Sequence, residues 1–208
     1  MTWPFSPLVP WSYSVVYADP AWPMYGDPNK DQAAGKHYAL MSQTELSALP
    51  VRELLGGKGV LLCWATCPRL DIAIDVIRSW GLYYRGVAYV WVKTTLAGNV
   101  ISGQGIRPTT VKPTTELVLV GTTHARGRPL PLLTESQGQV AFAPRGRHSE
   151  KPEEVRHRIE DLFGPVPRVE LFARKRTPGW DAWGDALQDV NPERSVTSDA
   201  DLGSRNAH

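Results

Sequence analysis

Short runs of hydrophobic residues alternate along the chain with polar stretches that are rich in glycine and proline. Five runs have the length and the β-branched or aromatic content of buried strands: residues 15–18, 60–64, 87–92, 117–120 and 168–172. An apolar stripe over residues 70–80, ended by Gly81, predicts an amphipathic helix. Because strands that alternate with helices are typical of α/β proteins, we expect a mainly parallel sheet flanked by helices.

Residues that typically cap the N-terminus of a helix predict two more helices. Ser42 and Glu45 form a capping box, which predicts a short helix over residues 43–49. Further along, Ser149 can cap a helix that has Pro152 in its first turn. The predicted helices therefore fall between predicted strands, as the α/β interpretation requires.

The remaining stretches suggest one domain with two unlike ends. Residues 1–13, in which proline recurs every third position, predict an extended arm packed over the domain. The domain itself spans residues 14–187, and the polar, acidic residues 188–208 predict a disordered tail. Within the domain, the breaker-rich stretches 23–37 and 94–115 predict two long loops, the first long enough to cover a site.

The composition of the chain indicates where the protein is located and which kinds of partner it can bind. The sequence has no apolar run near the ~20 residues of a membrane span and no signal-peptide pattern, so we expect a cytoplasmic protein without a membrane partner. The two cysteines, Cys63 and Cys67, lack a second ligand pair, so we expect reduced thiols and no metal site. Residues 1–180 hold 21 basic and 15 acidic side chains, and residues 181–208 hold 2 and 6, so the body is basic enough for a polyanionic partner.

The candidate chemistry follows the first predicted strand. In an open α/β sheet, ligands bind beyond the carboxyl ends of strands, and Asp19, Pro20 and Trp22 occupy that place here. Asp19 offers a carboxylate, Pro20 fixes the backbone carbonyls around the turn, and Trp22 offers a flat apolar face. These groups suit a planar ligand with an exocyclic amine. Taken alone, however, Asp19-Pro20 is more typical of an ordinary turn that ends a strand.

Asp19-Pro20-Ala21-Trp22 resembles the Asp-Pro-Pro-Trp signature of the N6-adenine methyltransferase family. That family includes the catalytic subunit of the eukaryotic mRNA methyltransferase and many bacterial and phage DNA methyltransferases. Further stretches resemble family blocks in the family's order across residues 14–186: 37–42, 62–66, 91–93, 116–121, 145–152, 170–174 and 179–184. Each block is weak alone, but their shared order makes the resemblance specific.

The resemblance implies a Rossmann-like fold that binds S-adenosylmethionine, in a permuted order with the catalytic motif first and much of the cofactor site last. It implies catalytic roles for Asp19, Pro20 and Trp22, and contacts to the target nucleoside from Tyr38, Trp91, Glu116 and Lys151. It places the cofactor against Asp19, Lys151, Glu170, Leu171, Phe172, Arg174 and Asp185. Without the resemblance, Lys151 would be a solvated helix-start lysine, and Glu170 could pair with Arg168 or Arg174 on an exposed face.

The mechanism follows from the chemistry of the amine. If Asp19 and the Pro20 carbonyl accept the two N6–H bonds, the N6 lone pair can localise and attack the sulfonium methyl group. A carboxylate nearby stabilises the positive charge that develops on N6. Because a paired base cannot reach such a pocket, the target must be flipped out or single-stranded.

Two departures from the family pattern keep alternatives open. Ala21 replaces a proline, and Asp185 stands where the family commonly has asparagine. The preferred hypothesis is adenine methylation of DNA, because no accessory RNA-binding domain is evident. The alternatives are RNA methylation, a catalytically inactive nucleic-acid-binding partner subunit, and methylation of a small molecule or protein nitrogen.

Several basic side chains are candidates for contacts with nucleic-acid phosphates: Arg107, Lys112, Arg126, Arg128, Arg145, Arg147, Arg156 and Arg158. The sequence does not indicate an oligomeric state.

Overall fold

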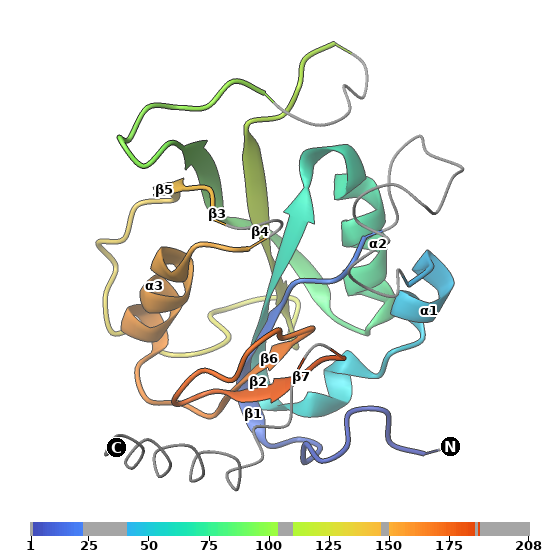
Figure 1. Ribbon diagram of the computed structural model, residues 1–208. Helices are drawn as coiled ribbons and strands as arrows, with labels where there is room; N and C mark the ends of the chain where they lie inside the picture. Colours follow the sequence, from blue (N-terminus) through green and yellow to red (C-terminus); the bar gives the residue numbers. More distant parts are fainter. Residues whose placement is uncertain (1, 23–40, 104–109, 147–149, 186, 188–208) are drawn as a thin grey trace, which may run out of the picture.

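A computed structural model describes residues 2–22, 41–103, 110–146, 150–185 and 187 of the protein. A seven-stranded sheet in the order β5-β3-β4-β2-β1-β6-β7 forms its centre (Figure 1). In chain order, the strands are β1 (Tyr13–Ala18), β2 (Leu55–Thr66), β3 (Tyr83–Thr94), β4 (Thr115–Thr122), β5 (Val140–Pro144), β6 (Arg168–Leu171) and β7 (Asp181–Trp183). All five predicted strands are present, and the short strands β5 and β7 were not predicted.

The described sheet is mainly parallel, as expected. Strand β4 runs antiparallel to its neighbours β2 and β3, whereas β1–β2, β1–β6, β3–β5 and β6–β7 are parallel pairs. No helix lies in the described part of the β3–β4 connection, and strands joined without a crossover pair antiparallel. The reversed strand brings the start of β4 to the edge where the parallel strands end, because Glu116 lies opposite Thr66.

The α-helices match the predictions at their centres and differ at their ends. They are α1 (Gln43–Ser47), α2 (Leu70–Ser79) and α3 (Glu153–Phe163). The capping box of α1 is confirmed, since the Ser42 Oγ accepts from the Glu45 backbone N–H at 3.2 Å. The predicted start of α3 is wrong by one residue: Pro152 is its N-cap and not part of its first turn, because Pro152 keeps an extended ψ of 134°. Ser149 lies outside the described residues.

Side chains that alternate along the central strands fill a separate core on each face of the sheet. Val16 and Ala18 of β1 belong to the core beneath α1 and α2, whereas Val15 and Tyr17 belong to the core beneath α3. Figure 1 shows α3 on one side of the sheet and α1 and α2 on the other. Both faces of β1 are therefore buried, which fixes the direction in which the chain emerges at Asp19.

The segment before β1 packs onto the domain. Phe5 is fully buried, and the backbone N–H of Leu8 donates to the Phe5 carbonyl at 2.8 Å, which makes a turn there. The Phe5 ring meets the Trp183 ring edge-on, with their centroids 5.0 Å apart. The start of the chain thus supports β7, next to the end of β6.

Gly184, at the end of β7, has no room for a side chain. A Cβ at this position would collide with the backbone of Ala173, whose N–H donates to the Trp183 carbonyl at 2.9 Å. We expect Gly184→Ala to lower the Tm by roughly 3–10 °C, because the backbone must shift to relieve the overlap. Thermal unfolding followed by circular dichroism measures this. Gly57→Ala is the matched control, since a Cβ on Gly57 would meet no atom within 4 Å; an equal loss in both variants would contradict the explanation.

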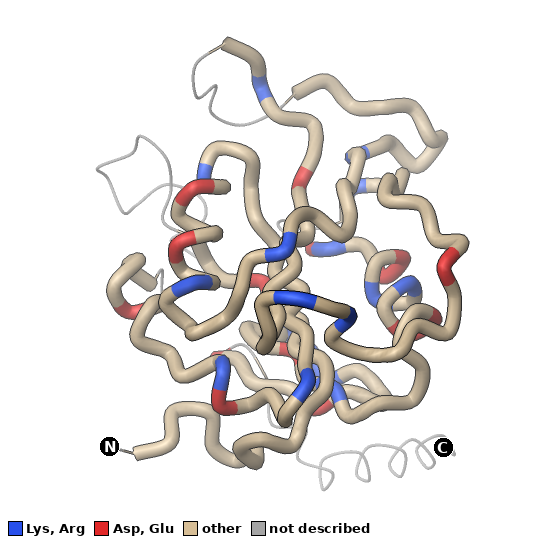
Figure 2. Tube along the Cα trace, turned by 180° about the vertical axis from the view of Figure 1, so that it is seen from behind, with Lys and Arg blue, Asp and Glu red and all other residues tan. Residues whose placement is uncertain are grey.

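Two global features complete the description. Within the residues described, no helix combines the length and apolar character needed to cross a bilayer. Seen from behind in Figure 2, the Lys and Arg positions are spread among Asp and Glu positions along the trace.

Candidate active site

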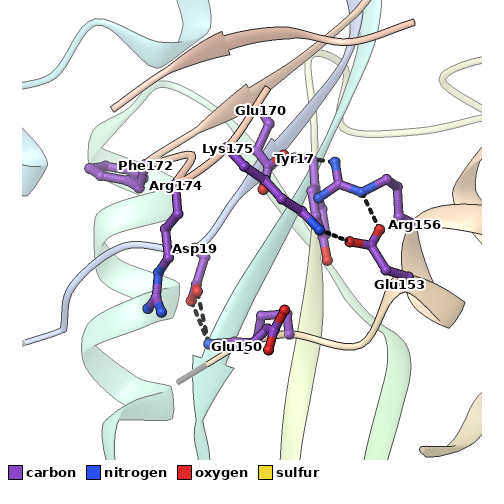
Figure 3. Close-up of a pocket in the computed structure, with 10 residues that line it drawn as sticks. Tyr17, Asp19, Glu150, Glu153, Arg156, Glu170, Phe172, Arg174 and Lys175 are labelled. Atoms are coloured by element: carbon purple, nitrogen blue, oxygen red, sulfur yellow. Dashed lines mark hydrogen bonds and ion pairs between the residues drawn. The ribbon is translucent and has the colours of Figure 1, made fainter. Parts of the chain in front are cut away.

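A cavity of about 290 Å³ lies where β1 and β6 end. The two strands are parallel neighbours, with Tyr17 opposite Glu170 and Ala18 opposite Leu171, so the residues that follow them emerge together. The cavity is lined by Tyr17, Asp19, Glu150, Lys151, Glu153, Arg156, Glu170, Phe172, Arg174 and Lys175 (Figure 3). Most of this lining is charged, with acids and bases in equal number. Of the predicted site residues, the cavity brings together Asp19, Lys151, Glu170, Phe172 and Arg174.

Asp19 and Lys151 form a tight ion pair in this cavity. The Lys151 Nζ lies 2.8 Å from each carboxylate oxygen of Asp19, and the two side chains are only 13% and 19% exposed. Burial raises the pKa of Asp19 above its usual value, and Lys151 offsets part of that rise. Lys151 is thus not a solvated helix-start lysine; it pairs with a buried carboxylate and favours the ionised form of that carboxylate.

Lys151, which pairs with Asp19, also lies close to a second carboxylate, that of Glu116. The Lys151 Nζ is 3.4 Å from Glu116 Oε2, and Lys93 Nζ is 2.6 Å from Glu116 Oε1. Burial alone would raise the pKa of Glu116, but Lys151 and Lys93 together lower it. Burial alone would lower the pKa of Lys151, and the two carboxylates raise it instead. The row Asp19–Lys151–Glu116–Lys93, drawn from four separate segments, therefore alternates carboxylates with amines.

Glu170 belongs to a different ion-pair row on the cavity wall. Arg156 Nη1 donates to Glu170 Oε2 at 2.7 Å, and Arg156 Nε donates to Glu153 Oε2 at 3.0 Å. Glu153 Oε1 accepts from Lys175 Nζ at 2.6 Å. In Figure 3, Asp19 and Arg174 lie to the left of the group formed by Glu170, Arg156, Glu153 and Lys175. Glu170 is thus paired with Arg156 inside the protein, and not with Arg168 or Arg174 on an exposed face.

The Asp19-Pro20-Ala21-Trp22 motif forms a tight turn. The backbone N–H of Trp22 donates to the Pro20 carbonyl at 2.9 Å. The Trp22 indole Nε1 donates to the Trp64 carbonyl at 2.9 Å, which fixes the ring at the end of β2. Trp22 is partly buried against the core beneath α1 and α2. Both the Pro20 carbonyl and the Trp22 ring are therefore held in fixed positions next to Asp19.

Other predicted site residues lie apart from the cavity lining. Trp91 is 2% exposed, and its indole Nε1 donates to the Ala143 carbonyl at 2.9 Å, so it packs beneath the site. The Leu171 side chain is fully buried in the core. Asp185 is exposed and does not line the cavity. Tyr38 and the predicted loop over residues 23–37 lie outside the described residues.

The residue after β6 has an unusual backbone conformation. Phe172 has a φ of 61°, which side-chain-bearing residues rarely adopt, and its ring meets Trp183 edge-on at 5.5 Å. This conformation ends β6 one residue earlier than the sequence predicted. It turns the chain so that Phe172 and Arg174 both line the cavity.

Sequence reasoning missed Lys93, Glu153, Arg156 and Lys175 as site residues. Arg156 was grouped with candidate phosphate contacts, but its side chain is only 8% exposed and paired inside the protein. Arg158 is also engaged: its Nη1 donates to the Gly138 and Val140 carbonyls at 3.0 Å. The spacing of α3 carried a signal for Arg156, since it shares the sheet-facing side with Val155, Ile159 and Phe163.

Comparisons with known proteins identify the family. The MT-A70 family model matches residues 13–186, which is most of the chain and includes both rows of charged residues. The chain belongs to the MT-A70 family. Methyltransferases of the MT-A70 family use S-adenosylmethionine, and the described strands and helices are consistent with their Rossmann-like fold. The resemblance found in the sequence is thus confirmed.

Individual relatives differ in how much of their length this MT-A70 chain covers. The type II methyltransferase M.MunI of a Mycoplasma species is 31% identical over 207 residues, covering 91% of this chain and 84% of that protein. The N6-methyladenosine RNA methyltransferase MTA1 of Cryphonectria parasitica is 29% identical, with 55% of its length covered. The human N(6)-adenosine-methyltransferase catalytic subunit METTL3 is 26% identical over 181 residues, and this chain spans 29% of it.

The cavity fits the cofactor of MT-A70 enzymes chemically. S-adenosylmethionine presents a sulfonium cation, a ribose diol, an adenine ring and an amino-acid group. The carboxylates of Asp19 and Glu170 suit the cation and the diol, and the Phe172 ring offers an apolar surface for the adenine. Within the described part of the chain, no cluster of His, Cys, Asp and Glu could hold a metal ion.

Proposed function

We propose that this MT-A70 chain transfers a methyl group from S-adenosylmethionine to the N6 amine of adenine in nucleic acid, with DNA preferred over RNA. One observation carries the proposal. Asp19, which follows β1, lines the same cavity as Glu170 of the neighbouring strand β6. A carboxylate suited to the target amine and a carboxylate suited to the cofactor therefore face one space.

Asp19 and Pro20 would orient the target amine. Adenine N6 is a poor nucleophile because its lone pair is delocalised into the ring. The Asp19 carboxylate and the Pro20 carbonyl can each accept one N6–H, which lets that lone pair localise. Although the Pro20 carbonyl already accepts the Trp22 N–H, a carbonyl has two lone pairs. Two fixed acceptors therefore hold the amine in one orientation before it reacts.

The charges around Asp19 suit the later stages of the reaction. When bound, the cofactor supplies a methyl group made electrophilic by its sulfonium. Positive charge then develops on N6, and the Asp19 carboxylate stabilises it. Lys151 favours the ionised form of Asp19 beforehand, and the raised pKa of Asp19 makes it a better acceptor for the proton that N6 finally loses.

Trp22 would receive the base. Its ring is anchored through the indole N–H on Trp64, so its plane is set before the substrate arrives. A base stacked there must leave the double helix, which requires a flipped or single-stranded nucleotide. The ring of Trp22 thus restricts the substrate to a planar base presented outside a stack.

The preference for DNA rests on similarity among the relatives. The type II methyltransferase is 31% identical to this chain over 207 residues, whereas the fungal RNA methyltransferase is 29% identical and METTL3 is 26% identical. We infer that its substrate follows the type II relative and is DNA.

The proposal is tested by methyl transfer from labelled S-adenosylmethionine to duplex DNA, single-stranded DNA and RNA of the same sequence. We expect label in N6-methyladenine after digestion to nucleosides, at the highest rate with DNA. Oligonucleotides without adenine are the control and should take up no label. Cofactor binding by calorimetry with no transfer to any adenine substrate would refute the enzymatic activity and favour the inactive partner subunit.

A further inference from the structure

Arg156 is a buried cation on the cavity wall. It sits in the first half of α3, on the side of that helix that faces the sheet, and its side chain is only 8% exposed. A buried guanidinium is costly unless its donors are satisfied, and here Nη1 donates to Glu170 and Nε to Glu153. Arg156 thus donates hydrogen bonds to two carboxylates, and both of these residues line the cavity.

Two aromatic rings fix the guanidinium in place. Its central carbon lies 5.4 Å from the ring centroid of Tyr17 and 5.4 Å from that of Trp180. Tyr17 lies opposite Glu170 in the β1–β6 pair, so the guanidinium, the ring and the carboxylate belong to one rigid group. Cation–π contacts of this kind restrict where a planar guanidinium can lie. The direction of the Glu170 carboxylate is therefore set by Arg156.

Arg156 uses only one of the two carboxylate oxygens of Glu170, a residue that lines the cavity. Arg156 bonds to Oε2 of Glu170, and Oε1 takes no part in that bond. A carboxylate accepts through both oxygens, so a ligand can use Oε1 while Oε2 stays anchored. Figure 3 shows the Glu170 side chain with Arg156 on one side and Arg174 on the other. Such an anchored acceptor suits a vicinal diol such as the ribose of a nucleoside.

We propose that Arg156 is a positioning residue for the cofactor: it holds Glu170 in the orientation that receives the ribose hydroxyls of S-adenosylmethionine. Through Glu153 it also fixes the start of α3, which directly follows Lys151 in the chain. The Arg156 side chain thereby fixes the position of the Glu170 carboxylate and also that of the segment that carries Lys151. This inference rests on the proposed function, because it takes S-adenosylmethionine as the ligand of the cavity.

A double-mutant cycle with S-adenosylmethionine binding as its readout tests this role. The dissociation constant is measured by calorimetry for the full chain, for Arg156→Met, for Glu170→Gln and for the double variant. We expect Arg156→Met to weaken binding about tenfold or more, since a buried charged hydrogen bond is lost. In a protein that already carries Glu170→Gln, Arg156→Met should weaken binding of S-adenosylmethionine little further, because Arg156 acts through Glu170.

Matched variants separate positioning from general stability. Arg158→Met removes an arginine two residues away on α3 that bonds Glu154 and backbone carbonyls, and it should leave the dissociation constant within about twofold of the parent. Arg156→Lys keeps the charge, and binding should be partly restored relative to Arg156→Met. If Arg156→Met does not fold by circular dichroism, the cycle is run with Arg156→Lys, which keeps the buried charge.

The binding measurements distinguish failure of the proposed function from failure of the positioning role of Arg156. If the parent protein does not bind S-adenosylmethionine, the proposed function fails. If the parent binds and the folded Arg156 variants bind equally well, the positioning role is refuted and the proposed function stands. Equal and additive losses in the two single variants would also refute it, because Arg156 would then act independently of Glu170.

Discussion

The Asp19→Asn variant is expected to lose about 10²- to 10³-fold in kcat for adenine methylation. Asparagine keeps the size and one acceptor of aspartate but removes the negative charge that faces the developing charge on N6. It also presents an amide donor near Lys151, where the parent has a carboxylate 2.8 Å from the Nζ. The loss should therefore appear in kcat, with the protein still folded.

Initial rates at saturating cofactor and oligonucleotide measure this, alongside Tm by circular dichroism. Asp75→Asn is the matched control, because Asp75 is an exposed residue of α2 in a surface pair with Arg78. Its rate should stay within about twofold of the parent, since exposed ion pairs contribute little. An Asp19→Asn variant that folds and keeps more than a tenth of the parental kcat would remove Asp19 from the mechanism.

Lys151→Met is expected to cost about 100-fold or more in kcat/KM at neutral pH. The change leaves two largely buried carboxylates, Asp19 and Glu116, without the cation between them. Lys93 still pairs with Glu116, so the uncompensated charge falls on Asp19. Asp19 is then protonated over a wider pH range and is a poorer acceptor for the N6 amine.

The pH profile gives this prediction a distinct signature. Burial already raises the pKa of Asp19, so parental activity should be lost on the acid side at a higher pH than for an ordinary aspartate. Lys151 lowers the pKa of Asp19, so removing it should raise that pKa further and move the acid limb of kcat/KM upward. Lys58→Met, an exposed change on β2, should leave the profile unchanged. An acid limb in Lys151→Met that stays in place or moves downward would contradict this explanation.

The sequence predicted what depends on local pattern. Asp19 was found because an acid, a proline and an indole follow a hydrophobic run directly, and this run is β1. Glu170, which lies in β6, was assigned to the cofactor only through the family resemblance. For Asp19 a strand signal and a chemical group lie within a few residues of each other, so no long-range contact had to be known.

The sequence could not predict contacts that only the packed sheet creates. Lys93 and Glu116 meet because β3 and β4 pair antiparallel, which depends on the connection between them and not on either strand. Arg156 resembled any surface arginine, since its burial requires Tyr17 and Trp180 to be brought together from distant parts of the chain. The role inferred for Trp91 from resemblance alone remains a prediction, and its side chain lies buried beneath Lys93.

The reversal of β4 has a consequence for how such a protein can diversify. Because β3 ends and β4 begins at the edge that carries Asp19, both ends of the connection between them are anchored beside the reacting groups. A change of sequence in that connection therefore alters the surroundings of Asp19 while the strand that leads to Asp19 is left unchanged.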